Sequence, residues 1–326
     1  MDLKSAIFNI KNENEFFNLT LQVFKFQFEY NPLYRSFCDL LYTTPSDVKD
    51  LKDIPFLPIG FFKSHKVLSS HCTEQIVFLS SGTTGQTTSK HFVSDLELYE
   101  TSFFKGFQNF YGPVEDYVVL GLLPSYLERE GSSLVYMVDQ LIKTSTHAES
   151  GFYLDDLDAL AKTIISLENQ QKKTILIGVS FALLNLIEKH LFQLKYTIVM
   201  ETGGMKGKRK EMIRKELHHL LKKGFGVQDI HSEYGMTELL SQAYSTGQGV
   251  FKTPPWMKVL TRESNDELTI QKAGKSGGVN IIDLANLNSC SFIATQDLGK
   301  VYNDGSFEII GRFDQSDIRG CNLMVL

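Results

Sequence analysis

One loop in the sequence has the composition of a phosphate-binding loop. Residues 80–91 read Ser-Ser-Gly-Thr-Thr-Gly-Gln-Thr-Thr-Ser-Lys-His and follow directly on an apolar run, residues 75–79. Gly82 and Gly85 allow the backbone to turn sharply and to bring its N–H groups close to a ligand. Hydroxyl groups supply further hydrogen-bond donors, from Ser80, Ser81, Thr83, Thr84, Thr87 and Thr88. We predict a cradle for a row of phosphate oxygens, with an ordinary surface turn as the alternative.

The loop does not match the P-loop of nucleoside triphosphatases. That motif requires Gly-Lys-Ser/Thr at the start of a helix, and no such sequence follows Gly82. Gly274-Lys275-Ser276 has the right residues but lacks the upstream glycine. The loop at residue 80 is therefore a phosphate loop of another kind, or a turn.

A pair of glycines follows another apolar run. Residues 201–204 read Glu-Thr-Gly-Gly, and Gly203 and Gly204 would let the backbone approach a flat ligand closely. Ligands of open α/β sheets bind outside the carboxyl ends of the strands, so the position suits a binding site. A plain strand-to-helix turn is the alternative for the same residues.

Residues 231–238, His-Ser-Glu-Tyr-Gly-Met-Thr-Glu, carry three different binding groups. Tyr234 offers a ring for stacking on a nucleobase. Thr237 offers a hydroxyl and Glu238 a carboxylate, and a carboxylate together with substrate phosphates is how proteins usually hold Mg²⁺. A surface loop is the alternative.

A last pair of segments contains groups that could bind a sugar. Residues 295–299 read Thr-Gln-Asp-Leu-Gly, and Asp297 could accept hydrogen bonds from both hydroxyls of a ribose. Residues 311–314 read Gly-Arg-Phe-Asp, and Arg312 could contact the same sugar or an adjacent phosphate. Alone, each segment is a turn.

The elements that must position these segments alternate between strand and helix. The first 41 residues have a helical pattern with phenylalanines on one face. Predicted strands are residues 117–123, 174–179 and 196–200. Predicted helices are residues 157–167 and 181–194, followed by a basic helix whose apolar face is Met212, Ile213, Leu217, Leu220 and Leu221. We expect Gly224 to end that helix. The alternation predicts a mainly parallel sheet flanked by helices.

The sequence changes character after about residue 242. Glycines become frequent, and Asp304-Gly305 is a hairpin signal between two strands. The predicted strands of this part are residues 267–271, 291–294 and 307–310. We expect a smaller, partly antiparallel β subdomain here.

Composition excludes several classes of function. The chain has 326 residues and a net charge of −5, which does not favour binding to nucleic acid. No secretory signal and no apolar run long enough to span a membrane are present. Four cysteines lack CxxC spacing, which argues against a zinc site and indicates cytosolic thiols, at Cys38, Cys72, Cys290 and Cys321. We expect a cytoplasmic protein.

The order of these segments resembles the adenylate-forming superfamily of acyl-CoA synthetases, adenylation domains and luciferases. Five segments match its motifs in sequence order: Ser81-Gly82-Thr83-Thr84-Gly85, Gly203-Gly204, Tyr234-Gly235-Met236-Thr237-Glu238, Asp297-Leu298-Gly299 and Gly311-Arg312-Phe313-Asp314. In the same order, the resemblance implies that these segments are the phosphate loop, the adenine-binding glycines, the Tyr-Gly-x-Thr-Glu motif, the segment with the ribose-binding aspartate, and the Gly-Arg-x-Asp motif at the end of the large domain.

The sequence departs from the superfamily pattern at two places. Thr87, Thr88 and Ser89 stand where most members have Pro-Lys-Gly, so the loop lysine is missing. The sequence also stops at Leu326, where most members continue into a small C-terminal domain that supplies a catalytic lysine.

With these two departures, the sequence resembles one branch of the superfamily, the acyl-protein synthetases of the bacterial luminescence fatty acid reductase system (LuxE-like). Further similarities are Ile-Pro-Phe-Leu-Pro at residues 54–58 and Arg-Gly-Cys-Asn-Leu at residues 319–323. The branch implies an α/β adenylate-forming large-domain fold. We expect a single domain over residues 1–326, with α/β layers to about residue 241, a small antiparallel β subdomain over residues 242–326, and no separate lid domain.

The resemblance implies a reaction and its partners. A carboxylic acid, with a fatty acid as the leading candidate, is activated by ATP to acyl-AMP, and the acyl group then passes to a protein cysteine as a thioester. In this branch a cysteine near the C-terminus accepts the acyl group, and Cys321 is the matching residue. The expected partners are the acid and an acyl-acceptor protein, a reductase or a carrier.

The resemblance also assigns the site residues. Glu238 is implied in catalysis and in holding Mg²⁺ together with phosphates. The residues implied in binding ATP and AMP are Ser80, Ser81, Gly82, Thr83, Thr84, Gly85, Gly203, Gly204, Tyr234, Gly235, Thr237, Asp297 and Arg312. Two alternatives remain: an acyl- or aryl-CoA ligase, in which CoA takes the place of Cys321, and a non-catalytic nucleotide-binding subunit.

Overall fold

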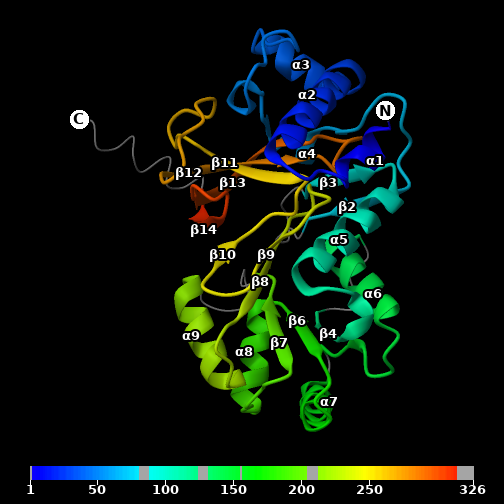
Figure 1. The fold of residues 1–326 in the computed structure, drawn as a ribbon, viewed down its shortest axis with the longest axis vertical. Coiled ribbons are helices and arrows are strands. Elements are labelled where there is room, and N and C mark those ends of the chain that lie inside the picture. The colour runs from blue at the N-terminus through cyan, green and yellow to red at the C-terminus, as the bar shows by residue number, and fades with distance from the viewer. Residues whose placement is uncertain (1, 81–87, 124–130, 155, 204–211, 314–326) are drawn as a thin grey trace, which may run out of the picture. The chain divides into compact units, whose positions relative to one another are not determined.

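The computed structural model describes residues 2–80, 88–123, 131–154, 156–203 and 212–313, and it divides into two compact units. Unit 1 comprises Met1–Phe61, Val67–His71 and Pro255–Leu326, and unit 2 comprises Phe62–Lys66 and Cys72–Pro254. Figure 1 shows the elements of both units along the chain. Unit 1 is therefore built from the two ends of the sequence.

Unit 1 is an antiparallel sheet covered by N-terminal helices. The sheet order is β14 (Phe307–Arg312), β13 (Phe292–Val301), β12 (Ser276–Asp283) and β11 (Met257–Arg262), and β1 (Leu57–Pro58) pairs in parallel with β13. The helices are α1 (Leu3–Ile7), α2 (Glu13–Tyr30) and α3 (Pro32–Leu40), followed by the short 3₁₀ turn η1 (Leu51–Asp53).

Helix α2 attaches to the sheet through a buried amide and an aromatic pair. Gln27 donates from Nε2 to the carbonyl oxygens of Asn286 and Leu287 at 3.0 and 2.8 Å. Phe24 packs edge-on against Phe292 of β13, with ring centroids 6.0 Å apart. The phenylalanine face that predicted a helix in the sequence is thus the face that meets the sheet.

Unit 2 is a mainly parallel sheet flanked by helices, as the alternation of strands and helices predicts. The sheet order is β5 (Gly151–Phe152), β4 (Val118–Leu122), β6 (Thr174–Gly178), β7 (Thr197–Glu201), β8 (His231–Tyr234) and β9 (Ala243–Ser245). Only the β8–β9 pair is antiparallel among these. Every residue of β4 and β6 is buried, because a parallel sheet is covered on both faces.

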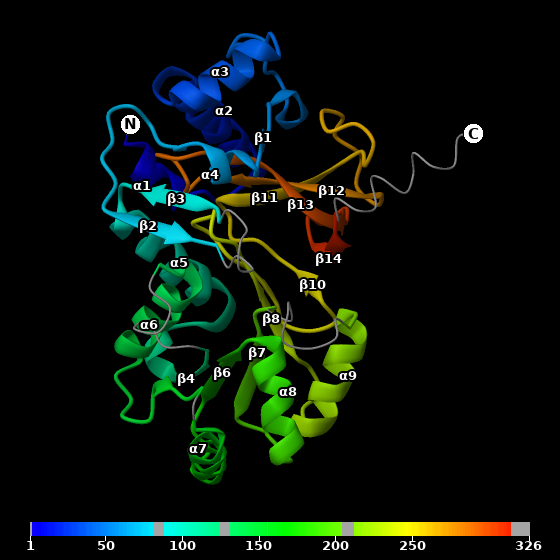
Figure 2. The same ribbon diagram turned by 180° about the vertical axis from the view of Figure 1, so that it is seen from behind.

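The helices of unit 2 lie on both sides of this sheet. They are α4 (Phe61–Ser64), α5 (Leu96–Tyr111), α6 (Ser133–Ser145), α7 (Leu157–Asn169), α8 (Ser180–Lys189) and α9 (Arg214–Phe225), with the 3₁₀ turn η2 (Val114–Asp116). Helices α8 and α9 lie together on one side, and α5 and α6 lie on the other (Figures 1 and 2). The remaining strands are the hairpin β2 (Ile76–Leu79) and β3 (Lys90–Val93), and β10 (Val250–Phe251).

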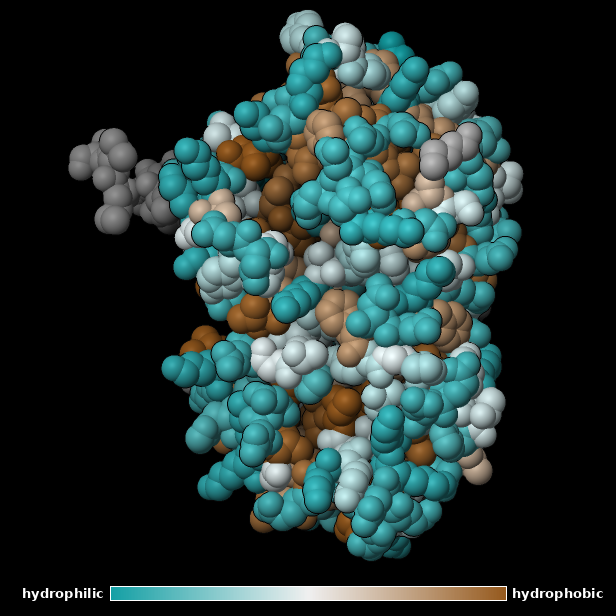
Figure 3. All heavy atoms as spheres, in the orientation of Figure 1, coloured by the Kyte–Doolittle hydropathy of each residue, from teal (hydrophilic) through white to brown (hydrophobic). Residues whose placement is uncertain are grey.

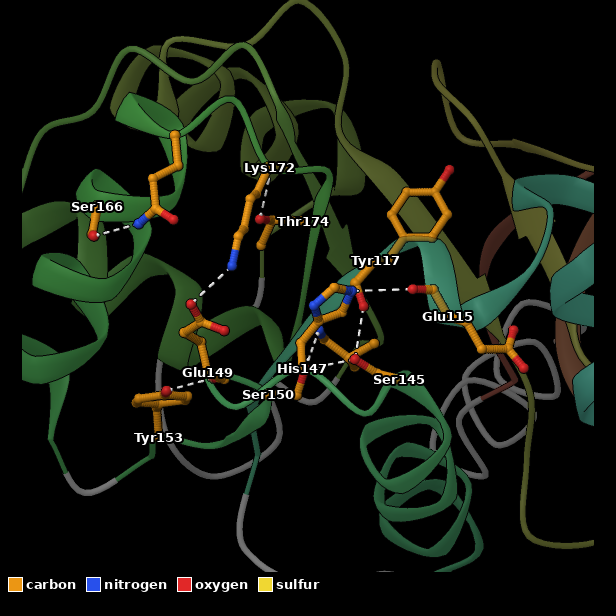
Figure 4. A network of polar contacts seen from close by, with 12 residues as sticks. Glu115, Tyr117, Ser145, His147, Glu149, Ser150, Tyr153, Ser166, Lys172 and Thr174 are labelled. Atoms are coloured by element: carbon orange, nitrogen blue, oxygen red, sulfur yellow. Dashed lines mark hydrogen bonds and ion pairs between the residues drawn. The ribbon is translucent and has the colours of Figure 1, made fainter.

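A polar network holds the amino ends of the strands (Figure 4). Ser145 Oγ donates to the Tyr117 carbonyl oxygen at 2.7 Å and lies 2.7 Å from Ser150 Oγ. Lys172 Nζ lies 3.1 Å from Glu149 Oε1. Tyr117 directly precedes β4 and Lys172 lies just before β6, so this network supports the edge of the sheet away from the carboxyl ends of its strands.

The structure corrects three details of the sequence-based prediction. Gly224 lies inside α9, packed against Ile187, and the helix ends instead at Gly226, whose φ of +67° is left-handed. Ile213 and Leu220 are exposed, so the buried face of α9 is narrower than predicted. Residues 267–271 form a turn with one isolated bridge, Arg262 to Ile270, rather than a strand. The hairpin at Asp304-Gly305 is confirmed between β13 and β14.

The face of the molecule drawn in Figure 3 is mostly polar. On the face drawn in Figure 3, hydrophilic residues cover most of the outer surface and apolar residues show between them in small groups. Within the described ranges, no helix has both the length and the apolar character needed to cross a membrane.

Gly226→Ala is expected to lower the free energy of unfolding by about 1–3 kcal/mol. The added Cβ would lie 2.6 Å from the carbonyl oxygen of Phe192, in a backbone conformation that alanine disfavours. Gly106→Ala is the matched control: it lies within α5 with no atom within 4 Å of the added Cβ, so we expect stabilisation of about 0.5–1 kcal/mol. Urea denaturation measures the free energy of unfolding of both variants. Equal effects of the two changes would contradict the assignment of Gly226 as the left-handed residue that ends α9.

Glu233 on β8 is a carboxyl group whose ionisation opposes folding. It lies opposite Tyr244 of β9 in the strand pairing. Burial and, next, the negative charge of Glu201 raise the pKa of Glu233 to about 8, from an ordinary value of 4.5. The folded protein therefore holds a proton that the unfolded chain has already released between these two pH values.

The stability of the wild-type protein is expected to fall as pH rises from about 4.5 to about 8, because the folded state binds the extra proton throughout this range. Glu233→Gln removes the titration and keeps the shape of the neutral carboxyl. We expect this variant to be more stable than wild type by on the order of 2 kcal/mol at pH 7, with little difference at pH 4.5. Urea denaturation at several pH values checks this, with the exposed Glu267→Gln as control. A wild-type-minus-variant difference that does not change with pH would exclude the assignment.

Candidate active site

The carboxyl ends of β7 and β8 lie next to each other in unit 2. Their parallel register pairs Met200 with His231 and Glu201 with Ser232. Gly203 and Tyr234 each come two residues beyond this last pair, at the same edge of the sheet. The structure therefore brings together two segments that were selected separately from the sequence, at the edge where α/β sheets bind ligands.

The turn after β7 requires glycine for its backbone. Gly203 has φ of +73°, and no atom lies within 4 Å of the position that its Cβ would take. Its N–H donates to Glu201 Oε2 at 2.7 Å, and its carbonyl oxygen accepts from the N–H of Ser180, the first residue of α8, at 2.8 Å. The open space and the fixed peptide suit a ligand that approaches the backbone. Gly204 lies outside the described residues.

The segment after β8 is packed closely against its own strand. Tyr234 is buried, and its ring centroid lies 5.8 Å from that of Phe251 on β10. A Cβ on Gly235 would meet Glu233 Oε1 at 2.5 Å, so a larger residue there would require the Glu233 carboxyl group to move. Glu238 is also buried, whereas Thr237 is partly exposed.

The predicted phosphate loop connects the two strands of the β2–β3 hairpin. Ser80 begins the loop and closes it, because its hydroxyl accepts the Ser89 N–H at 2.9 Å and its own N–H donates to the Ser89 carbonyl oxygen at 3.1 Å. Ser81, Gly82, Thr83, Thr84 and Gly85 lie outside the described residues.

A buried histidine joins this hairpin to the segment after β8. His91 on β3 is fully buried, and its Nδ1 lies 2.8 Å from the carbonyl oxygen of Thr237. The ring also packs edge-on against Phe62, with centroids 5.7 Å apart. His91 was not selected from the sequence, although its place in the Ser-Lys-His end of the loop was a usable signal.

Asp297 and Arg312 come together in unit 1. They face each other in the pairing of β13 with β14, and Arg312 Nε lies 3.7 Å from Asp297 Oδ1. The Arg312 side chain is 51% exposed and that of Asp297 is 17% exposed. These two predicted ribose contacts thus belong to one unit, and Ser80, Gly203 and residues 234–238 belong to the other.

The acidic residue at the end of β7 was not recognised from the sequence. Glu201 is 2% exposed, with Arg214 Nε at 3.3 Å and His218 Nε2 at 3.4 Å from its Oε1. An acidic residue that ends the run Thr-Ile-Val-Met-Glu, directly before the glycine pair, was the signal that could have identified it.

Two of the cysteines are unsuited to react as thiolates. Burial, the main cause, raises the pKa of Cys38 to about 12 and raises that of Cys290 well above its ordinary value. Cys72 is partly exposed, and Cys321 lies outside the described residues.

The chain is similar in fold to solved structures of other proteins. The chain is similar to ATP-bound MatB from Rhodopseudomonas palustris, with a TM-score of 0.55, 16% identity, and coverage of 72% of this chain and 47% of MatB. It spans about half the length of MatB. It is also similar to an open conformation of 2-hydroxyisobutyryl-CoA ligase in complex with 2-HIB-AMP and CoA, with a TM-score of 0.63, 13% identity, and coverage of 94% of this chain and 72% of the ligase. The predicted α/β fold class, with its antiparallel C-terminal sheet, is confirmed.

Sequence comparison identifies the family. No curated protein matches the chain. The model of the family described as acyl-protein synthetase, LuxE, matches residues 6–326, nearly the whole sequence. The chain therefore belongs to the acyl-protein synthetase (LuxE) family.

Proposed function

We propose that this protein activates a carboxylic acid with ATP to an acyl-adenylate and then transfers the acyl group to a cysteine as a thioester. The observation that carries the proposal is the meeting of Gly203 and residues 234–238 at the carboxyl ends of neighbouring parallel strands. His91 attaches the hairpin of the phosphate loop to the same segment. Family membership and the adenylate-forming fold support the same class of enzyme.

The first step makes a mixed anhydride. An oxygen of the substrate carboxylate attacks the α-phosphorus of ATP, and the bond from that phosphorus to the bridging oxygen breaks, so that pyrophosphate leaves with the bonding electrons. Little covalent chemistry is required of the protein, which positions the reactants and neutralises charge. The loop that starts at Ser80 cradles the pyrophosphate, and Thr237 contacts the phosphates.

The nucleoside has three sets of contacts in this proposal. Tyr234 stacks on adenine, and the open space beside Gly203 receives its edge. Asp297 accepts hydrogen bonds from the ribose hydroxyls. Arg312, whose half-exposed guanidinium lies near Asp297, contacts the sugar or the α-phosphate.

The residues present suit a Mg²⁺ that arrives with the nucleotide. Within the part of the chain that the structure describes, no group of three His, Cys, Asp or Glu side chains is arranged to hold a metal alone. Mg²⁺ commonly binds through one or two carboxylates and substrate phosphates, and Glu238 supplies such a carboxylate. Bound there, the ion would offset the negative charge of the phosphates.

The second step moves the acyl group to sulfur. A thiolate attacks the carbonyl carbon of the acyl-adenylate, a C–S bond forms, the C–O bond to the phosphate breaks, and AMP leaves. Cys321 is the proposed nucleophile because it occupies the family position near the C-terminus. A fatty acid is the leading substrate candidate, and the acceptor beyond Cys321 is a reductase or a carrier protein in the cytoplasm.

An acyl-CoA ligase is the second candidate. The observation that favours it is the similarity to 2-hydroxyisobutyryl-CoA ligase, whose structure contains CoA. The two candidates share the first step and differ in the acceptor of the acyl group.

Wild-type protein is expected to catalyse exchange of labelled pyrophosphate into ATP when the correct acid is added. Glu238→Gln should lower the exchange rate at least about tenfold, because a neutral amide binds Mg²⁺ and its phosphates less well. A panel of fatty, short-chain and aromatic acids identifies the substrate. No exchange with any acid, while ATP still binds, would favour a non-catalytic nucleotide-binding subunit instead.

Wild-type protein incubated with ATP and labelled acid is expected to retain a hydroxylamine-sensitive adduct that Cys321→Ser loses. Cys72→Ser is the matched control, since Cys72 is partly exposed and plays no part in the proposal. Intact-protein mass spectrometry measures the adduct and identifies the acid. Equal labelling of the Cys321 variant would exclude it as acceptor, and free acyl-CoA on addition of CoA would support the ligase alternative.

A further inference from the structure

A buried carboxylate lies next to the proposed nucleotide contacts of unit 2. Glu201 is the last residue of β7 and is 2% exposed. Its Oε2 accepts from the N–H of Gly203 at 2.7 Å, and Ser180 Oγ lies 3.4 Å from the same oxygen. Its Oε1 lies 3.3 Å from Arg214 Nε and 3.4 Å from His218 Nε2. Both carboxylate oxygens are therefore occupied.

The first connection runs from Glu201 to the glycine turn. The bond from Gly203 N–H and the bond from Ser180 N–H to the Gly203 carbonyl hold this residue on both sides. Gly203 has a left-handed backbone, and within the described ranges no atom lies within 4 Å of the position that its Cβ would take. The Thr202 N–H also donates to the Gly178 carbonyl oxygen, at 3.1 Å. Three hydrogen bonds therefore hold this turn, and one of them ends on Glu201.

The second connection runs from Glu201 to the ring of Tyr234. Arg214, paired with Glu201, places its guanidinium carbon 5.0 Å from the centroid of the Phe251 ring. Phe251 in turn lies 5.8 Å from Tyr234, centroid to centroid. A guanidinium held over an aromatic face is a directional contact, which a flexible cation would not reproduce.

Glu201 is ionised in the neutral pH range. Burial opposes ionisation, but the hydrogen bond from His218, the positive charge of Arg214 and the Gly203 N–H together lower the pKa of Glu201 to about 2. Charge-assisted hydrogen bonds are roughly twice as strong as neutral ones, so loss of the charge weakens several contacts together.

We infer that Glu201 is a positioning residue for nucleotide binding: it aligns the Gly203 turn directly and the Tyr234 ring through Arg214 and Phe251. The inference rests on the proposed function, in which Gly203 and Tyr234 contact the adenine of ATP. Glu201 itself does not touch the reacting atoms. Its loss is therefore expected to weaken nucleotide binding more than it slows the chemical step.

Glu201→Gln tests this, because glutamine keeps the shape and can still accept from Gly203 but lacks the charge. We expect the KM for ATP in pyrophosphate exchange, and the Kd for AMP measured by calorimetry, to rise about tenfold or more. The kcat for exchange should change less than about threefold, since the reacting groups are intact.

Glu168→Gln is the matched control for a merely structural effect. Glu168 holds the other end of the same strand, accepting from the N–H of Tyr196 at 3.0 Å and from Thr197 Oγ1 at 2.7 Å. We expect this variant to lose thermal stability while its Kd for AMP stays within about twofold of wild type. An unchanged Kd in Glu201→Gln, or an equal increase in both variants, would overturn the inference.

Arg214→Lys and Phe251→Leu test the second connection and replace Glu201→Gln if that variant does not fold. Each should raise the Kd for AMP, and in combination with Glu201→Gln the effects should be less than additive, because the residues act through one chain of contacts. Unchanged Kd values in both would overturn the second connection.

A wild type that binds AMP but catalyses no exchange contradicts the proposed activity alone, whereas a wild type that binds no adenine nucleotide overturns both proposals.

Discussion

The parallel pairing of β7 with β8 is the constraint on which the candidate site depends. Because Glu201 pairs with Ser232, the residues two positions further along, Gly203 and Tyr234, lie at the same edge of the sheet. A shift of one residue would turn Tyr234 to the opposite face and separate its ring from Phe251. The apolar side chains of β6 and β7 hold that register from the core, because side chains of a parallel sheet are buried on both faces. The site is thus fixed by core residues that take no part in the proposed chemistry.

Two of the acidic side chains near this edge, Glu201 and Glu233, are kept in different protonation states. Glu201 is ionised, with Arg214 and His218 beside it, and its charge helps to keep Glu233 neutral. Of these two side chains, only Glu201 carries a negative charge, and Arg214 and His218 compensate that charge. This arrangement suits a place where a nucleotide with several negative charges is proposed to bind, since like charges there would oppose its approach.

Local patterns in the sequence were sufficient for much of the fold and for part of the site. The apolar runs predicted β4, β6 and β7 closely, because a short, continuous apolar run between turn residues is typical of a strand buried on both faces. The end of α9 was placed two residues early, since Gly224 and Gly226 look alike in sequence and differ only in what surrounds them. Glu201, His91 and Arg214 were not selected because their roles depend on partners from other elements. The contact of His91 with Thr237, 146 positions away, has no local signature.

The discontinuous composition of unit 1 has a consequence for synthesis of the chain. Gln27 of α2 completes its hydrogen bonds only with residues 286–291, which leave the ribosome after all of unit 2. The apolar face of α2, including Phe24, therefore lacks its sheet while all of unit 2 is being made and can already fold, because domains generally fold as units in the order of synthesis. During this interval the nascent helix exposes phenylalanines to solvent and to chaperones. We therefore expect completion of unit 1 to be the slower stage of folding, because its contacts join residues that are far apart in the sequence.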